Sequence, residues 1–327
     1  MRLKTNLGAD AAILVTTVIW GSTFAVARDI LDHWPPLAYL ALRLGLATLV
    51  FAALFPRQLA RAGGAAWRAG AALGLLIGVG FLGQTAGLLY TTPAKSAFIT
   101  GLTTPLVPFV AFLLTRARPS RENMIGVVLA SLGGALILAP AGAEGFNTGD
   151  LVTLSTTLLF ATHITLLGRF ARRFDARQLS VLQIGVAAAL LGAAWGGLRL
   201  YAAAGGQLAP ALARELEPLV WGGRAAWQLV YLSLVATVIT FLLWTWGQAR
   251  MSATHAAIIF SLEPVFATLF AVLVRGSAEW TGGRATAGAL LVVAGVIASE
   301  LRWGSRRPRD EDEEGGEATA AGAAAID

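Results

Sequence analysis

Three ionisable side chains, those of Arg43, His163 and Glu263, lie within long apolar stretches of the 327-residue chain. A charge in hydrocarbon costs about 3 kcal/mol or more unless it finds a partner or water. Glu263 is followed by Pro264, which frees a backbone carbonyl. Its carboxyl group can therefore titrate and couple proton movement, or it can hold a helix kink by bonding exposed backbone.

Arg43 and His163 each have two interpretations. Arg43 can bind a carboxylate or another anion, or it can snorkel to the membrane surface or donate to a helix carbonyl. His163 can relay protons or bind a substrate, or it can stay neutral and hydrogen-bond a neighbouring helix. The residue types leave these alternatives open.

Polar and aromatic side chains recur at similar depths in other apolar stretches. Such polar residues often only join helices, and aromatic residues near span ends often form an interfacial belt. Pro105 and Pro264 fall near mid-span, where kinked backbone should face protein or a wet cavity. We therefore predict helix kinks at these two prolines and a central substrate cavity lined by Trp20, Ser22, Thr23, Arg43, Gln84, Thr100, Thr103, His163, Trp244, Ser261 and Glu263.

Several other chemistries find no support in the residues. The chain has no cysteine, and His33, His163 and His255 lie far apart. Neither an HExxH nor a GxxxxGK[ST] motif occurs. The sequence therefore predicts no metal site, no cofactor, no ATP hydrolysis and no enzymatic activity.

The elements that position these residues are membrane helices. Residues of the AVILMFWYC group make up 56% of the chain and charged residues 13%, whereas a soluble domain carries about 25% charged residues. Apolar runs of about 20 residues, enough to cross a bilayer, predict an all-α integral membrane protein with ten transmembrane helices. They lie near residues 10–27, 36–55, 69–90, 95–115, 122–139, 150–169, 179–200, 227–248, 253–274 and 285–301. A cleaved signal peptide is the alternative for the first run.

Lysine and arginine counts predict the orientation. With the N-terminus inside, the inner segments hold 17 of these residues and the outer segments hold 7. The positive-inside rule then places residues 1–9 and the C-terminus in the cytoplasm. The net charge of +6 follows from these short loops and does not indicate nucleic-acid binding.

Two segments connect or follow the spans. The outside loop 201–226 can carry a short interfacial helix. Residues 303–327, acidic and poor in apolar side chains, predict a disordered cytoplasmic tail that is dispensable for insertion and transport. A regulatory tail is the alternative.

The halves 10–139 and 150–302 resemble one another. Identical pairs at fixed offsets of 140 and 159 include Asp10/Asp150, Thr16/Thr156, Thr17/Thr157 and Pro105/Pro264. Each half has five predicted spans, so the second half must enter the membrane from the opposite side. Such inverted five-helix repeats are typical of secondary transporters, which bind substrate near the midplane between the halves.

Four motifs in this order resemble EamA-type members of the drug/metabolite transporter superfamily. They are Trp20-Gly21-Ser22-Thr23-Phe24, the stretch from Leu89 to Thr100, the stretch from Ala253 to Ala267, and the stretch from Gly288 to Leu301. The likeness covers residues 10–302 and implies two EamA repeats around a central cavity. Family members often carry a glutamate after the fourth helix, where this chain has Arg116-Ala117-Arg118-Pro119, while Glu279 holds the corresponding place after the ninth.

We therefore predict a multi-pass transporter of small organic metabolites or drugs in the cell (inner, cytoplasmic) membrane. It would be an exporter or exchanger that works by alternating access. Its expected partners are a small-molecule substrate and the lipid bilayer, and a monomer and a homodimer fit equally well. An intramembrane enzyme or a channel is the alternative.

Overall fold

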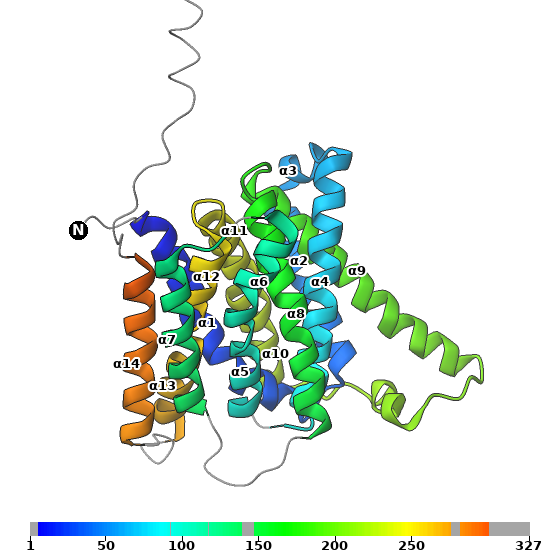
Figure 1. The fold of residues 1–327 in the computed structure, drawn as a ribbon. Coiled ribbons are helices and arrows are strands. Elements are labelled where there is room, and N and C mark those ends of the chain that lie inside the picture. Colours follow the sequence, from blue (N-terminus) through cyan, green and yellow to red (C-terminus); the bar gives the residue numbers. More distant parts are fainter. Residues whose placement is uncertain (1–5, 92, 117, 139–146, 276–281, 301–327) are drawn as a thin grey trace, which may run out of the picture.

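The computed structural model describes residues 6–91, 93–116, 118–138, 147–275 and 282–300. Within these ranges all regular structure is helical, and the helices pack side by side (Figure 1). This confirms the predicted all-helical class. The first half contains α1 (Leu7–Leu31), α2 (Pro36–Leu54), α3 (Pro56–Ala60), α4 (Gly64–Leu88), α5 (Pro93–Gly101), α6 (Thr103–Thr115) and α7 (Arg121–Leu138).

The second half contains α8 (Thr148–Phe170), α9 (Ala176–Ala203), the 3₁₀ helix η1 (Pro210–Leu216), α10 (Gly223–Val230), the π-helix η2 (Tyr231–Ile239), α11 (Thr240–Gln248), α12 (Ala253–Phe260), α13 (Glu263–Arg275) and α14 (Gly283–Glu300). The predicted tail 303–327 and Glu279 lie outside the described residues.

Polar caps and prolines mark where several helices begin. Asn6 accepts a first-turn amide of α1, Asn147 and Asp150 form a reciprocal capping box at α8, and Asp175 caps α9. These side chains satisfy amides that lack a partner inside the helix. α2 starts at Pro36, a position where the missing N–H costs nothing.

Seven of the described helical stretches are long and apolar enough to cross a membrane. They are Leu7–Leu31, Pro36–Leu54, Gly64–Leu88, Thr148–Phe170, Ala176–Ala203, Gly223–Gln248 and Ala253–Phe270. The other three predicted spans fall on α5 with α6, which are separated by Leu102, and on α7 and α14, which have 18 residues each. The chain is therefore a multi-pass membrane protein.

Two helical stretches are interrupted, and each break lies directly N-terminal to one of the predicted prolines, on the side where a proline disrupts a helix. α5 ends at Gly101 and α6 begins at Thr103, while α12 ends at Phe260 and α13 begins at Glu263. Pro105 and Pro264 sit in the first turn of the second piece, where an amide has no helical partner to lose. Pro108 lies inside α6 and was not singled out from the sequence.

The predicted span 227–248 is continuous with α10 but contains the π-helix η2 in its middle. The wider turn changes which carbonyls are available for bonding. The Thr237 hydroxyl donates to the Leu232 carbonyl, five residues earlier, at 2.8 Å. π-Helical turns of this kind often occur at functional sites, and nothing in the apolar sequence of this span indicated one.

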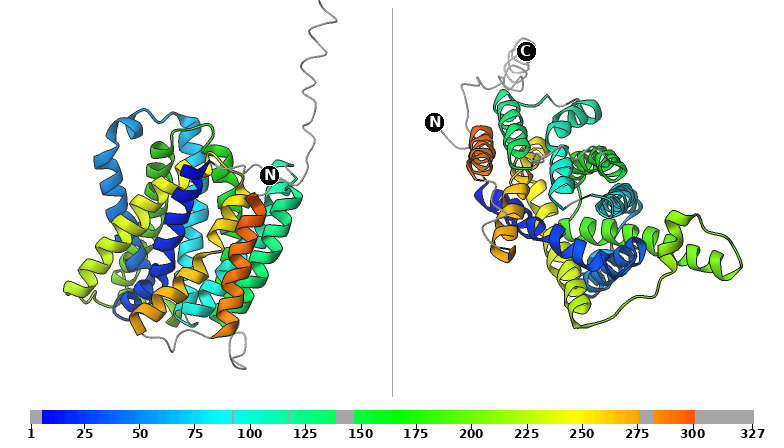
Figure 2. Two further views of the ribbon diagram at one scale, coloured as in Figure 1. Left: turned by 90° about the vertical axis from the view of Figure 1, so that its left-hand side faces the viewer. Right: turned by 90° about the horizontal axis from the view of Figure 1, so that it is seen from below.

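Glycines allow the helices to approach closely. α7 lies along α14, and α4 lies against α8 and α9 (Figure 2). A Cβ at Gly74 would lie 2.6 Å from the Gln183 carbonyl oxygen, and one at Gly133 would lie 2.5 Å from that of Gly288. Both distances are too short for any larger residue, so these contacts require glycine.

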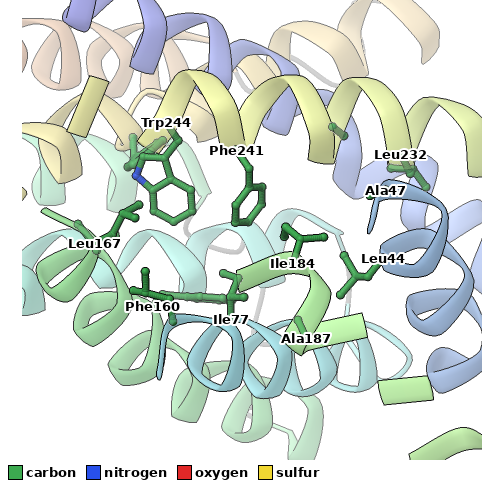
Figure 3. Packing of buried hydrophobic residues seen from close by; sticks show 14 of the residues in the cluster. Leu44, Ala47, Ile77, Phe160, Leu167, Ile184, Ala187, Leu232, Phe241 and Trp244 are labelled. Atoms are coloured by element: carbon green, nitrogen blue, oxygen red, sulfur yellow. The ribbon is translucent and has the colours of Figure 1, made fainter. Parts of the chain in front are cut away.

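The apolar core lies where α4, α8, α9 and α11 meet. Figure 3 shows Phe241 and Trp244 of α11 lying near Ile77 of α4 and Phe160 of α8. Lipid chains are as apolar as these side chains, so close van der Waals packing rather than water exclusion holds the helices together.

The predicted outside loop 201–226 contains η1 and runs beside the start of α2. The distal half of α9 extends away from the bundle and leads into this loop (Figure 1). A Glu215 carboxylate oxygen accepts the Leu37 amide at 3.2 Å, and the Trp34 indole N–H donates to the Val220 carbonyl at 2.8 Å. The short helix expected in this loop is thus a 3₁₀ helix held against α2.

Candidate functional site

A central cavity of about 100 Å³ lies inside the bundle, between residues from both halves of the chain. Helices α1, α2, α4, α5, α6, α8, α11, α12 and α13 contribute to its lining, together with Thr103 and Thr104 at the α5–α6 break. The lining residues are Trp20, Thr23, Phe24, Arg43, Ile77, Phe81, Gln84, Thr100, Gly101, Thr103, Thr104, Phe160, Ile164, Trp244, Ala257, Phe260 and Glu263.

Eight of the eleven predicted cavity residues line this space, namely Trp20, Thr23, Arg43, Gln84, Thr100, Thr103, Trp244 and Glu263. Ser22, Ser261 and His163 do not. The Ser22 hydroxyl lies 2.5 Å from the Tyr231 hydroxyl, and Ser261 donates to the Ile258 carbonyl of its own helix. His163 is buried behind Trp244, with its Nε2 2.8 Å from the Gln183 Oε1.

One wall of the cavity is aromatic. The ring centroids of Trp20 and Phe260 lie 5.4 Å apart in a stacked arrangement, and Trp244 meets Trp20 edge-on at 5.1 Å. The indole N–H groups are both engaged, with Trp20 donating to Ala236 O and Trp244 donating to Gln248 Oε1. The hydrogen bonds fix the ring orientations, which favours contact with flat or cationic groups.

Arg43 is held by the π-helix. Its Nε donates to the Leu232 carbonyl at 3.3 Å and to the Thr237 hydroxyl at 3.1 Å, and its Nη2 lies 3.4 Å from the Ala236 carbonyl. The guanidinium carbon lies 5.3 Å from the centroid of the Phe81 ring. The helix-carbonyl interpretation of Arg43 therefore matches the structure, and the π-helix supplies the carbonyls.

Glu263 opens α13 directly after the break. Within the described residues its carboxylate forms no hydrogen bond and no ion pair, although it lines the cavity. A free carboxylate on a cavity wall is a group that a ligand or a proton can engage. The structure thus separates the two ionisable cavity residues. Each guanidinium nitrogen of Arg43 donates to a protein acceptor, whereas the Glu263 carboxylate has no partner within the described residues.

The remaining polar groups bridge helices. The Gln84 side-chain amide donates to the Thr100 hydroxyl at 3.0 Å, and the Thr104 hydroxyl donates to the Ala257 carbonyl at 3.1 Å. These bonds join α4 to α5 and α6 to α12 beside the two breaks. Within the described residues, no group of three His, Asp or Glu side chains is placed to hold a metal ion.

Most lining residues that the sequence analysis missed are apolar. Ile77, Phe81, Phe160, Ile164 and Phe260 look like any other apolar residue of a membrane span. The π-helix is not visible in the sequence either. The usable signals were the family-like stretches around Trp20 and around Glu263, which contain Phe24 and Phe260.

An all-helical bundle with several helices long enough to cross a membrane, around a central cavity, defines a multi-pass membrane protein. The model of the EamA-like transporter family matches two successive stretches, residues 7–139 and 147–300. The chain belongs to this family, within the drug/metabolite transporter superfamily.

Two relatives that match the chain over most of its length are named as transporters. The chain is similar to an uncharacterized transporter of Archaeoglobus fulgidus, 28% identical over 91% of this chain and 87% of the relative. It is also similar to the uncharacterized transporter YyaM of Bacillus subtilis, 23% identical over 89% of this chain and 93% of that relative. A crystal structure that is 20% identical covers 90% of this chain and 97% of its own with a TM-score of 0.70, which shows a shared fold.

Proposed function

We propose that the chain transports small organic molecules by alternating access around the central cavity, as an exporter or exchanger. The observation that carries the proposal is the free carboxylate of Glu263 opposite the aromatic wall of Trp20, Trp244 and Phe260. A carboxylate beside aromatic faces suits a small organic molecule with an amine or another positively charged group. Protonation of the same carboxylate would release such a ligand.

The proposal includes ten transmembrane helices built as two inverted five-helix repeats. The family model matches the chain twice. The packing is similar when the halves are exchanged, because α1 packs on α11 and α13 as α8 packs on α4 and α6. The two breaks, at Leu102 and at Ser261-Leu262, also correspond at the offset of 159 found in the sequence. Equivalent halves support two equivalent conformations, one open to each side.

We further propose that both termini face the cytoplasm of a cell membrane. α1 begins and α14 ends on the same face of the bundle (Figure 1). That face carries the arginine-rich ends of α6 and α8, as the positive-inside rule requires for the cytoplasmic side. The outer face then carries the loop that contains η1.

The first test is an efflux comparison. Cells that express the wild type or Glu263→Gln are compared with empty-vector cells across a panel of organic amines, neutral metabolites and carboxylates. We expect efflux of some amines with the wild type and a loss of at least about tenfold with Glu263→Gln, since the charge that binds the amine is gone. Glu217→Gln, in the exposed outer loop, is the matched control.

The second test measures access to the cavity. The chain has no cysteine, so single cysteines at Gln84 and Thr100 can be labelled with polar thiol reagents from either side of the membrane. We expect both positions to be labelled, and we expect a bound substrate to slow the labelling. Substrate should not change the labelling of Leu113→Cys, which lies on the exposed surface of α6. Efflux that continues with both positions inaccessible from either side would contradict the cavity as the transport site.

A further inference from the structure

A second and larger hollow of about 960 Å³ opens on the face where α1 begins and where α6, α8 and α14 end. Helices α6, α8 and α12 line both this hollow, called the vestibule below, and the central cavity. The vestibule therefore lies at one end of the same helices that enclose the cavity. Six arginines line it, namely Arg116, Arg118, Arg169, Arg172, Arg173 and Arg250.

The vestibule carries a large excess of positive charge. Within the described residues, no carboxylate lies within ion-pair distance of any of the six arginines. Arg172 donates to the Met251 carbonyl and Arg250 donates to the Trp246 carbonyl. Asp10, which also lines the hollow, lies 3.1 Å from the Nε2 of His255. Several cations facing one partly enclosed space attract anions strongly.

The chain itself supplies an anionic segment of fitting size. Asp310-Glu311-Asp312-Glu313-Glu314 is a run of five consecutive acidic residues. It follows α14, and Ser299 in the last turn of α14 lines the vestibule. The linker of residues 301–309 spans about 30 Å when extended and about 17 Å as a flexible coil. A tether this short gives an effective concentration on the order of millimolar.

We propose that the acidic segment 310–314 docks in the vestibule and pairs with its arginines. Arginine and carboxylate groups match in charge and in bidentate geometry. Arg302, Arg306, Arg307 and Arg309 of the linker offer the segment competing partners, but they do not neutralise the vestibule. Docking gives the arginines of the vestibule carboxylate partners and gives the acidic residues 310–314 positively charged partners.

Distance measurements on the full chain test the docking directly. Spin labels are placed at Leu114→Cys in the vestibule lining and at Gly315→Cys after the acidic run, with the protein in nanodiscs. Docking predicts a narrow population of short distances. Neutralising the segment (D310N, E311Q, D312N, E313Q and E314Q together) should replace it by a broad distribution of longer distances. An unchanged distribution in the neutralised chain overturns the proposal.

A matched pair of arginine variants locates the docking site. Arg118, Arg169 and Arg173 line the vestibule and form no side-chain hydrogen bond within the described residues, so R118Q/R169Q/R173Q should abolish the short distances without disturbing the fold. R57Q/R61Q/R68Q removes the same charge from the same face outside the vestibule and should preserve them. Equal loss in both variants would show attraction to the whole face and would overturn docking in this hollow.

Measurements at different salt concentrations and in different lipids distinguish the acidic segment from lipid headgroups as the group that occupies the vestibule. Charge pairing predicts that the short distances fade between about 0.1 M and 1 M salt, as the Debye length falls from about 10 Å to about 3 Å. They should persist with anionic lipids in the nanodisc. Short distances that appear only in zwitterionic lipid would show that headgroups hold the arginines instead, contrary to the proposal. None of these measurements requires transport, so the docking and the proposed function can fail separately.

Discussion

The two ends of the bundle place equivalent carboxylates in different surroundings. Asp150, at the start of α8, is fully buried, accepts the Thr91 hydroxyl at 2.6 Å and closes a capping box with Asn147. Its counterpart Asp10, at the start of α1, is partly exposed, borders the vestibule and lies 3.1 Å from His255. Asp150 thus belongs to a packed end of the bundle, whereas Asp10 lies beside the hollow that opens at the other end.

The proposed alternating access predicts a difference of this kind between the two ends. In the proposed inverted repeat the helices at the two ends of the bundle have equivalent arrangements. Side-chain contacts therefore decide which end is closed. The buried contact of Asp150 joins α8 to the residues before α5, and the contact of Asp10 joins α1 to α12. Opening the first and burying the second would produce the opposite state.

The largest expected effect comes from Asp150→Ala. The change removes the acceptor of the Asn147 amide in the capping box and leaves the buried Thr91 hydroxyl without its acceptor, so we expect a loss of about 2–3 kcal/mol in the free energy of unfolding. Thermal unfolding in detergent, followed by tryptophan fluorescence, measures it. Asp150→Asn retains a side-chain acceptor and should lose less. Equal losses for the two variants would indicate that the carboxylate charge matters more than the hydrogen bonds.

A smaller effect is expected from Asp10→Ala. The contact with His255 is partly exposed, so its removal should cost about 1 kcal/mol or less under the same conditions. The variant should instead widen access to the vestibule, which would appear as faster labelling of Thr254→Cys by a polar thiol reagent. A loss of stability as large as that of Asp150→Ala would contradict the proposed difference between the two ends.

The smallest effect concerns Glu215 in the outer loop. Burial raises the pKa of Glu215 above its ordinary value of 4.5, against the amides of Leu37 and Ala38 and the charge of Arg214, which lower it. The folded state therefore holds the proton more tightly than the unfolded state. The contribution of Glu215 to stability falls as the pH rises from about 4.5 through its raised pKa.

Glu215→Gln should remove this dependence, because glutamine keeps the acceptor for the Leu37 amide without a charge. We expect the variant to match the wild type near pH 4 and to be slightly more stable at pH 7. Unfolding temperatures of the wild type and the variant, measured from pH 4 to pH 7 with Glu217→Gln as control, test this pH dependence. A wild type that gains stability relative to the variant as the pH rises would refute the assigned sign.

Particular residues show how far the sequence alone could reach. Trp20, Gln84, Thr100 and Glu263 were expected in one cavity and line one, because polar or aromatic residues deep in apolar spans have few other places to go. Ser22 and His163 were expected there too, but they bond other helices. Depth along a helix is readable from sequence, whereas the direction that a side chain faces depends on helix rotation.

The two helix breaks differ from the π-helix in how far the sequence indicates them. Pro105 and Pro264 indicate the breaks, which lie within one turn before them, because a proline removes the bond to the carbonyl four residues earlier. The π-helix that binds Arg43 had no sequence signal. A wide helical turn within an apolar span is set by how neighbouring helices pack.

The sequence by itself determined that this is a helical membrane protein of the EamA family with two similar halves, because apolar run length, arginine placement and repeated motifs are properties of the chain. Tertiary structure alone decided which ionisable group stays available. Arg43 and Glu263 look alike in sequence, each a single charge within an apolar span. The carbonyls of η2 bind Arg43, while Glu263, directly after the break, faces the cavity without a partner among the described residues. Only the packing of separate helices creates that difference, because the carbonyl that accepts from the Arg43 Nε lies 189 residues away in the chain.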